Sequence, residues 1–121
     1  MSLTINGSGG GIPVGTPTIE TGSYVGAGTY GSTNKNSITF ERTPVFVLII
    51  PNTLSTGSSG LAFMYPQENL SRVLIYYSNT TGWRGWTTTL SGTTVSWYSS
   101  LSKEEQFNSS TVTYRYFAVT I

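Results

Sequence analysis

The sequence predicts an all-β protein, an antiparallel β-sandwich with jelly-roll-like or related Greek-key topology. Short runs rich in Val, Ile, Tyr, Thr and Phe alternate with Gly, Asn and Ser residues about every 8–12 positions, which is the spacing of sandwich strands. Apolar residues rarely recur at the three- and four-residue intervals of an amphipathic helix. At 121 residues, the chain fits one domain with a substantial core.

The expected domain covers residues 18–121 and follows a flexible Gly/Pro-rich linker at residues 1–17. Pro66 to Leu70 has the composition of a single helical turn. Ser102 to Glu105 has the residue order of a capping box, but the run is too short for a stable helix. The expected strands span residues 18–25, 36–42, 45–50, 60–65, 72–78, 83–89, 93–99, 104–108 and 111–121.

The glycines that follow the first strand have the spacing of a dinucleotide-binding fingerprint. Gly26, Gly28 and Gly31 match its spelling, but residues 32–36 and another strand follow them where the fingerprint needs a helix. No acidic residue stands about 20 positions further on to hold a ribose. The sequence therefore favours a Gly-rich bend between two strands.

Two strands are apolar on both of their alternating faces. Val45 to Ile50 is wholly apolar, and Thr111 to Ile121 places aromatic or aliphatic side chains on either side. A strand of an isolated sandwich usually has one polar face. A second cover is therefore needed, from another sheet, a long loop or another subunit, and we expect a homo-oligomer.

The composition indicates a protein that binds rather than one that catalyses. Asp, His and Cys are absent, and charged residues make up 9 % of the chain. These missing types supply most general bases and metal ligands, so we expect no catalytic residues, no metal and no cofactor. The net charge is +1 and the cations are scattered, which disfavours nucleic acid as a partner.

The sequence also gives no sign of membrane insertion. Met1 to Ile5 lacks the basic start and apolar stretch of a signal peptide. The longest apolar run, Val45 to Ile50, is far shorter than the roughly 20 residues of a membrane helix.

An aromatic cluster is the strongest candidate for a binding site. Aromatic rings stack on the C–H faces of sugars, and Arg and Asn donate hydrogen bonds to hydroxyl groups. The same residue types also favour protein interfaces, and they can fill a core. In an alternating strand Trp83 and Trp86 face opposite sides, so one of them is expected to point inward. The candidate ligand-binding residues are Trp83, Arg84, Trp86, Tyr77, Asn79 and Tyr98.

The carboxylates leave an enzymatic alternative open. A polysaccharide depolymerase uses two carboxyl groups roughly 5–10 Å apart. Glu104 and Glu105 are neighbours and would point to opposite faces of the expected strand, while the other three Glu residues are isolated. A catalytic pair would therefore have to come from two subunits.

A succession of short motifs along the chain resembles a known family. These motifs are residues 22–31, 37–40, 43–49, 94–99, 106–110 and 113–119. Together they resemble the C-terminal tip domains of tail-fibre and receptor-binding proteins from phages and prophages of Gram-positive, often gut, bacteria. The glycine usual between Ser110 and the last strand is missing here, which affects the geometry expected for the final hairpin.

The resemblance implies a trimeric β-sandwich tip on the phage virion that binds bacterial surface polysaccharide or teichoic acid, with no catalytic residues. The function predicted from the sequence is therefore non-catalytic recognition of a cell-surface glycan. The alternatives are a purely structural oligomerisation domain of the virion or tail, and the depolymerase.

Overall fold

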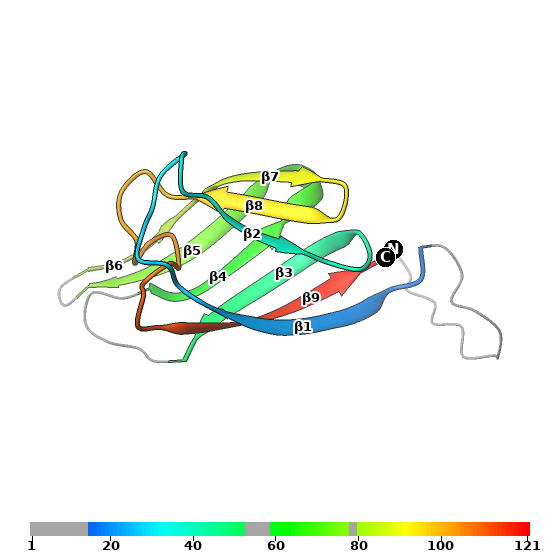
Figure 1. The fold of residues 1–121 in the computed structure, drawn as a ribbon, viewed down its shortest axis with the longest axis horizontal. Helices are drawn as coiled ribbons and strands as arrows, with labels where there is room; N and C mark the ends of the chain where they lie inside the picture. Colours follow the sequence, from blue (N-terminus) through cyan, green and yellow to red (C-terminus); the bar gives the residue numbers. More distant parts are fainter. Residues whose placement is uncertain (1–14, 53–58, 78–79) are drawn as a thin grey trace.

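The computed structural model describes residues 15–52, 59–77 and 80–121, which form two antiparallel β-sheets packed face to face (Figure 1). The all-β sandwich predicted from the sequence is confirmed. One sheet has six strands in the order β1-β9-β3-β4-β5-β6, and the other has three in the order β2-β8-β7. The elements are β1 (Thr18–Val25), β2 (Asn36–Thr39), β3 (Pro44–Pro51), β4 (Ser59–Tyr65), the 3-10 turn η1 (Pro66–Glu68), β5 (Leu70–Tyr77), β6 (Thr80–Arg84), β7 (Thr87–Ser91), β8 (Thr94–Tyr98) and β9 (Thr113–Thr120).

The larger sheet combines a meander with a long-range return. Strands β3, β4, β5 and β6 follow one another as antiparallel neighbours. Strand β9 then returns from the end of the chain and lies between β1 and β3. A late strand that returns beside the first strand of a meander is a feature of Greek-key arrangements.

The expected strand at residues 83–89 is wrong, because the chain changes sheets in its middle. Strand β6 ends at Arg84 in the larger sheet, and β7 begins at Thr87 in the smaller one. At the crossing, the Ser71 hydroxyl lies 2.8 Å from the backbone N of Trp86 and 3.2 Å from its carbonyl oxygen. A side chain thus provides the partner that a neighbouring strand would otherwise supply.

The expected strand at residues 104–108 is also wrong, and the segment forms a turn. Ser102 accepts a hydrogen bond at Oγ from the backbone N–H of Glu105 (3.0 Å), and its carbonyl accepts one from Gln106 (3.1 Å). The capping-box order therefore starts one turn that does not continue as a helix. The helical turn expected after Pro66 is present as η1, closed by Asn69 in the left-handed region.

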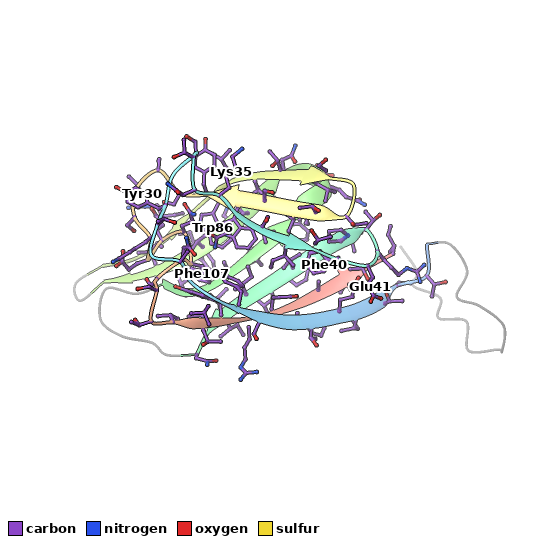
Figure 2. All side chains as sticks on the ribbon, in the orientation of Figure 1. Tyr30, Lys35, Phe40, Glu41, Trp86 and Phe107 are labelled. Carbon is purple, nitrogen blue, oxygen red and sulfur yellow. The ribbon has the colours of Figure 1, made fainter. Side chains whose placement is uncertain are left out.

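The core lies between the two sheets and is rich in aromatic residues (Figure 2). Trp97 and Phe107 are fully buried, as are Val47 and Ile49 of β3. The ring of Trp86 stacks on that of Trp97 at 5.2 Å and meets Phe107 edge to face at 5.3 Å. Aromatic pairs in these geometries stabilise a core beyond the burial of their area.

The strands expected to be apolar on both faces lie side by side in the larger sheet. In β3, Val47 and Ile49 point into the core, while Ile50 on the other side is 47 % exposed. In β9, Ala118 is buried and Phe117 is 41 % exposed. Within the described chain, the smaller sheet covers one side of these strands. The homo-oligomer stays a prediction.

Candidate ligand-binding site

Two segments that are far apart in the sequence meet at one end of the sandwich. Residues 26–35, after β1, lie beside residues 99–112, between β8 and β9 (Figure 1). The backbone N–H of Gly28 donates to the Asn108 carbonyl at 2.7 Å. A Cβ atom on Gly26 would lie 2.1 Å from the Ser109 carbonyl oxygen, so this close approach needs glycine. The bend expected at these glycines is confirmed.

The side chain of Gln106 joins the two segments. Its carbonyl oxygen accepts hydrogen bonds from the backbone N–H groups of Gly31 and Ser99, both at 2.9 Å. Its amide nitrogen donates to the carbonyl of Asn34 at 2.8 Å and to the side chain of Asn36 at 3.0 Å. Because Gln106 is fully buried, these four hydrogen bonds satisfy its amide group without water.

Asn108 fixes the first part of the bend in a similar way. Its Oδ1 accepts from the backbone N–H of Ala27 at 2.8 Å, and its Nδ2 donates to the Thr29 carbonyl at 2.8 Å. Asn36, at the start of β2, donates from Nδ2 to the Phe107 carbonyl at 3.0 Å. The path of residues 27–36 is therefore set by buried amide side chains.

Three aromatic side chains donate to successive carbonyls of the turn. The Trp86 indole donates to the Glu105 carbonyl at 2.6 Å, the Trp97 indole to that of Gln106 at 2.9 Å, and the Tyr24 hydroxyl to that of Phe107 at 2.9 Å. These bonds use the carbonyls that a strand would direct to a neighbouring strand, which explains why residues 104–108 are not a strand.

A pocket opens where the two segments meet. Its volume is about 310 Å³, near the lower end of the range of about 300–1,000 Å³ for small-molecule sites. Trp97 also lines the pocket but is fully buried, so it presents no ring face for stacking. The exposed part of the wall comes from Ala27, Thr29, Asn34, Lys35 and Ser37. The remaining lining residues are Tyr24, Asn36 and Asn108.

Lys35 gives the pocket its charge. It is the one charged residue among the nine that line the pocket. Its Nζ lies 5.9 Å from the centre of the Tyr98 ring, a cation–π contact that orients the side chain at the end of the sandwich (Figure 2). The lining residues therefore carry hydroxyl, amide and ammonium groups, and the ammonium group of Lys35 lies over Tyr98, which is not a lining residue.

Burial keeps the phenol of Tyr24 neutral. Desolvation raises the pKa of Tyr24 well above its ordinary value, with the neighbouring Tyr114 adding to the effect and a hydrogen bond with Asn36 opposing it. The pKa of Tyr114 is also raised, mainly by burial. The ring of Tyr24 stacks on that of Tyr114 at 5.0 Å.

These raised pKa values predict a loss of stability in alkali. Above about pH 10 the unfolded chain releases its tyrosine protons while the native state retains them. These two tyrosines therefore leave the free energy of unfolding independent of pH below about pH 10, and they lower it as the pH rises further. Tyr24→Phe is expected to make this fall shallower, at a cost of about 1 kcal/mol at pH 7 for the lost hydrogen bond. Urea unfolding at several pH values measures both effects.

The exposed Tyr30 provides the matched control for that experiment. Tyr30→Phe is expected to leave the stability at pH 7 unchanged, because this side chain is 46 % exposed. Equal pH profiles for Tyr24→Phe and the parent protein would contradict the assignment.

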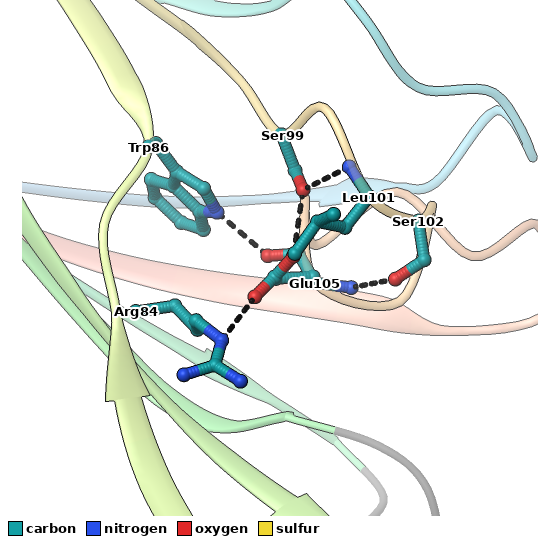
Figure 3. A network of polar contacts seen from close by, with 6 residues as sticks. All are labelled: Arg84, Trp86, Ser99, Leu101, Ser102 and Glu105. Atoms are coloured by element: carbon teal, nitrogen blue, oxygen red, sulfur yellow. Dashed lines mark hydrogen bonds and ion pairs between the residues drawn. The ribbon is translucent and has the colours of Figure 1, made fainter.

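A buried carboxylate supports the turn from its other side (Figure 3). Glu105 accepts at Oε2 from the Ser99 hydroxyl at 2.9 Å, and its Oε1 lies 3.6 Å from Nε of Arg84. Ser99 Oγ also accepts from the backbone N–H of Leu101 at 3.1 Å. These contacts make Glu105 part of the scaffold. They differ from the strand-borne side chain expected from the sequence.

The structure separates the predicted aromatic cluster. Trp83 is 52 % exposed on the outside of the larger sheet, whereas Trp86 is 6 % exposed in the core and cannot stack on a ligand. This confirms that one of the two indoles points inward. Arg84 lies on the opposite side of β6 from Trp83, beside Glu105, and Tyr98 lies on the smaller sheet under Lys35. Asn79 and the side chain of Tyr77 fall outside the described parts.

Sequence reasoning missed the residues that build the pocket. Gln106, Asn108 and Asn36 act over separations of about 70 to 80 residues, which no local pattern reveals. Lys35 stood in a polar, turn-like run and was not predicted as a ligand-binding residue. The sequence feature that could have indicated these residues is the pair of amide side chains on either side of Phe107, within a short polar segment.

Comparisons of this chain with models of protein families, with curated proteins and with solved structures find no significant match. Within the described residues, no helix reaches the length and hydrophobicity that a membrane span requires. The same residues contain no group of three or more acidic, His or Cys side chains placed to hold a metal ion.

Proposed function

We propose that this chain is a non-catalytic binding module, the tip of a phage tail fibre on the virion, and that it recognises a bacterial cell-surface glycan. The observation that carries the proposal is the pocket at the loop end of the sandwich. The residues of its exposed wall carry hydroxyl, amide and ammonium groups, which match the hydrogen-bonding groups of a polysaccharide.

Pre-organisation of the pocket supports binding. Gln106 and Asn108, whose side chains are buried, hold the segment 27–36 through hydrogen bonds to the carbonyls of Asn34 and Thr29. A wall that is already ordered loses little conformational entropy when a ligand arrives. Binding at one shallow site is expected to be weak, and presentation of several copies on one fibre would raise the overall affinity through effective concentration.

The charge of Lys35 favours a polymer that carries acidic groups. No lining residue of the pocket is a carboxylate. An ammonium group next to neutral hydrogen-bonding side chains attracts phosphate or carboxylate substituents. Teichoic acid and acidic wall polysaccharide both present such groups along a chain of hydroxyl-bearing units.

Titration of purified wall teichoic acid and acidic polysaccharide into the protein tests the proposal. Lys35→Ala is expected to weaken binding by roughly tenfold, as for the loss of one charge-assisted hydrogen bond, and to reduce its dependence on salt. Lys103→Ala removes the same charge from an exposed turn position outside the pocket lining, and it should bind like the parent. Equal weakening by both variants, or no binding to any bacterial wall fraction, would overturn the proposal.

The enzymatic alternative has its own readout. A depolymerase would release reducing ends from the same polysaccharides, and one Glu→Gln change would abolish the release. The position of Glu105 within a hydrogen-bonded scaffold gives no support to a catalytic role for it. A rate of reducing-end release above the uncatalysed background would replace the binding proposal with this alternative.

A further inference from the structure

The side of the larger sheet that faces away from the smaller one is apolar over most of its width. We call it the outer face. It carries an aromatic group in which Phe63 contacts Tyr65 at 6.0 Å and Trp83 at 5.9 Å, with Phe46 stacked on Phe63 at 6.3 Å. Its described outward residues are Ile19, Thr21, Ser23, Val25, Phe46, Leu48, Ile50, Leu61, Phe63, Tyr65, Leu70, Arg72, Leu74, Trp83, Thr113, Arg115, Phe117 and Val119.

One row across the outer face has a guanidinium near one end and an indole at the other. Strand pairing aligns Ser23 with Arg115, Arg115 with Ile50, Leu61 with Leu74 and Leu74 with Trp83. The pairing of Ile49 with Ala62 puts Ile50 beside Leu61. The row therefore reads Ser23, Arg115, Ile50, Leu61, Leu74 and Trp83.

We propose that the outer face seats a second copy of this chain, with a two-fold axis parallel to the strands that passes over Leu61. A two-fold axis in this position reverses the row. It places Arg115 of each copy over Trp83 of the other, and Ile50 over Leu74. Leu61 meets its own equivalent, as required of a self-complementary contact. The arrangement is independent of glycan binding.

The charges on the outer face are compatible with a second copy of the chain. Arg72 and Arg115 are its charged residues among the described outward positions, so two copies in an arbitrary register could bring like charges together. The two-fold row instead sets Arg115 against an indole face, a favourable cation–π partner. In the neighbouring row, Arg72 pairs with Phe63 along the sheet and Phe63 lies beside Leu48. The same operation therefore sets Arg72 over Leu48, where its aliphatic stem can pack.

The two-fold arrangement overlaps five strands of each copy, β9, β3, β4, β5 and β6, because Ser23 of β1 has no counterpart beyond Trp83. Five strands about 4.8 Å apart, each with about seven residues rising about 3.3 Å, span roughly 19 by 23 Å. The relief of the side chains adds to this planar area of roughly 440 Å², which is about half of the roughly 800 Å² that each partner contributes to a standard interface. Trp83, Phe117 and Ile50 are each more than 40 % exposed in the single chain, so packing would bury a large apolar area.

The number of copies distinguishes this inference from the family resemblance, which implies three.

Sheets that pack face to face align within about 30° of each other. Arg115 and Trp83 have the longest side chains of the row, and they lie two strands from the proposed axis on either side. Their length lets them reach each other across that angle.

Sedimentation velocity of the 121-residue chain over the micromolar range tests the oligomeric state. A dimer is expected. Leu61→Arg places two guanidinium groups face to face at the axis and should raise the dimer Kd by roughly 30-fold or more, as for a hot-spot residue. Thr89→Arg, on the exposed side of the smaller sheet, adds the same charge and should leave the Kd unchanged.

A double-mutant cycle tests the register. Arg115 and Trp83 are four strands, or about 19 Å, apart in one chain, so they cannot interact directly within it. The effects of Arg115→Ala and Trp83→Ala on the dimer Kd should nevertheless be non-additive, because each removes the same contact between copies. Circular dichroism of each variant checks that it is folded.

Chemical crosslinking gives an independent readout. The chain has no cysteine, so Leu61→Cys introduces one thiol per chain. A short bifunctional thiol reagent that spans the about 10 Å between packed sheets should link two copies through position 61, whereas Thr89→Cys should remain unlinked. A protein that stays monomeric, a trimer that survives Leu61→Arg, or additive effects in the cycle would each overturn the inference.

Discussion

Trp86→Ala is expected to lower the free energy of unfolding by about 3–5 kcal/mol, the range measured for buried aromatic residues truncated to alanine. The Trp86 ring packs between Trp97 and Phe107, and its N–H satisfies the Glu105 carbonyl. The substitution therefore leaves both a cavity and an unpaired buried carbonyl. Urea unfolding followed by circular dichroism measures the loss.

Trp83→Ala is the matched control, since it removes the same side chain three residues away. Trp83 is half exposed and its main ring contact is with Phe63 on the outer face. Its loss should cost about 1 kcal/mol or less when the protein is monomeric. Equal destabilisation by the two variants would contradict the assignment of Trp86 to the core and Trp83 to the surface.

Gln106→Ala is expected to cost about 3 kcal/mol and to abolish ligand binding at the pocket. The change removes four hydrogen bonds and leaves the N–H groups of Gly31 and Ser99 without their side-chain acceptor; each unsatisfied buried group costs about 1–3 kcal/mol. It also frees the segment that bears Lys35, because the bonds to Asn34 and Asn36 flank that residue.

Two further variants separate these contributions. Gln106→Glu keeps the acceptor but removes the donated hydrogen bonds to Asn34 and Asn36, and its effect on binding should approach that of alanine. Gln67→Ala, at an exposed position on η1, should change neither stability nor binding. Full ligand affinity in a folded Gln106→Ala protein would show that the pocket does not depend on this side chain.

The fold was predictable because its signals are local. Alternation of side chains along a strand and Gly or Pro between strands mark elements such as β1 and β3 without knowledge of their partners. The same alternation predicted that Trp83 and Trp86 point in opposite directions. The local signal failed where a distant residue replaces a strand partner, as Ser71 does at the crossing between β6 and β7.

The site was less predictable because its residues act through distant partners. Trp86 and Tyr98 were predicted to bind a ligand because they are aromatic. In the structure Trp86 lies in the core, and the ring of Tyr98 lies beneath the ammonium group of Lys35. Trp86, Trp97 and Tyr24 donate to the carbonyls of the turn at 104–108, and these donors come from the crossing between β6 and β7, from β8 and from β1. A strand-like composition could not reveal that its hydrogen-bond partners are side chains.

The turn at residues 104–108 has a consequence for how binding specificity can change. Gln106 and Asn108 hold the backbone of residues 27–36 through groups that face inward, whereas Asn34 and Ser37 are exposed. The residues that hold the backbone in place are therefore different from the residues that would contact a ligand. Randomising the solvent-facing positions while retaining the two amides should yield a library whose members mostly fold and differ in the sugars that they select.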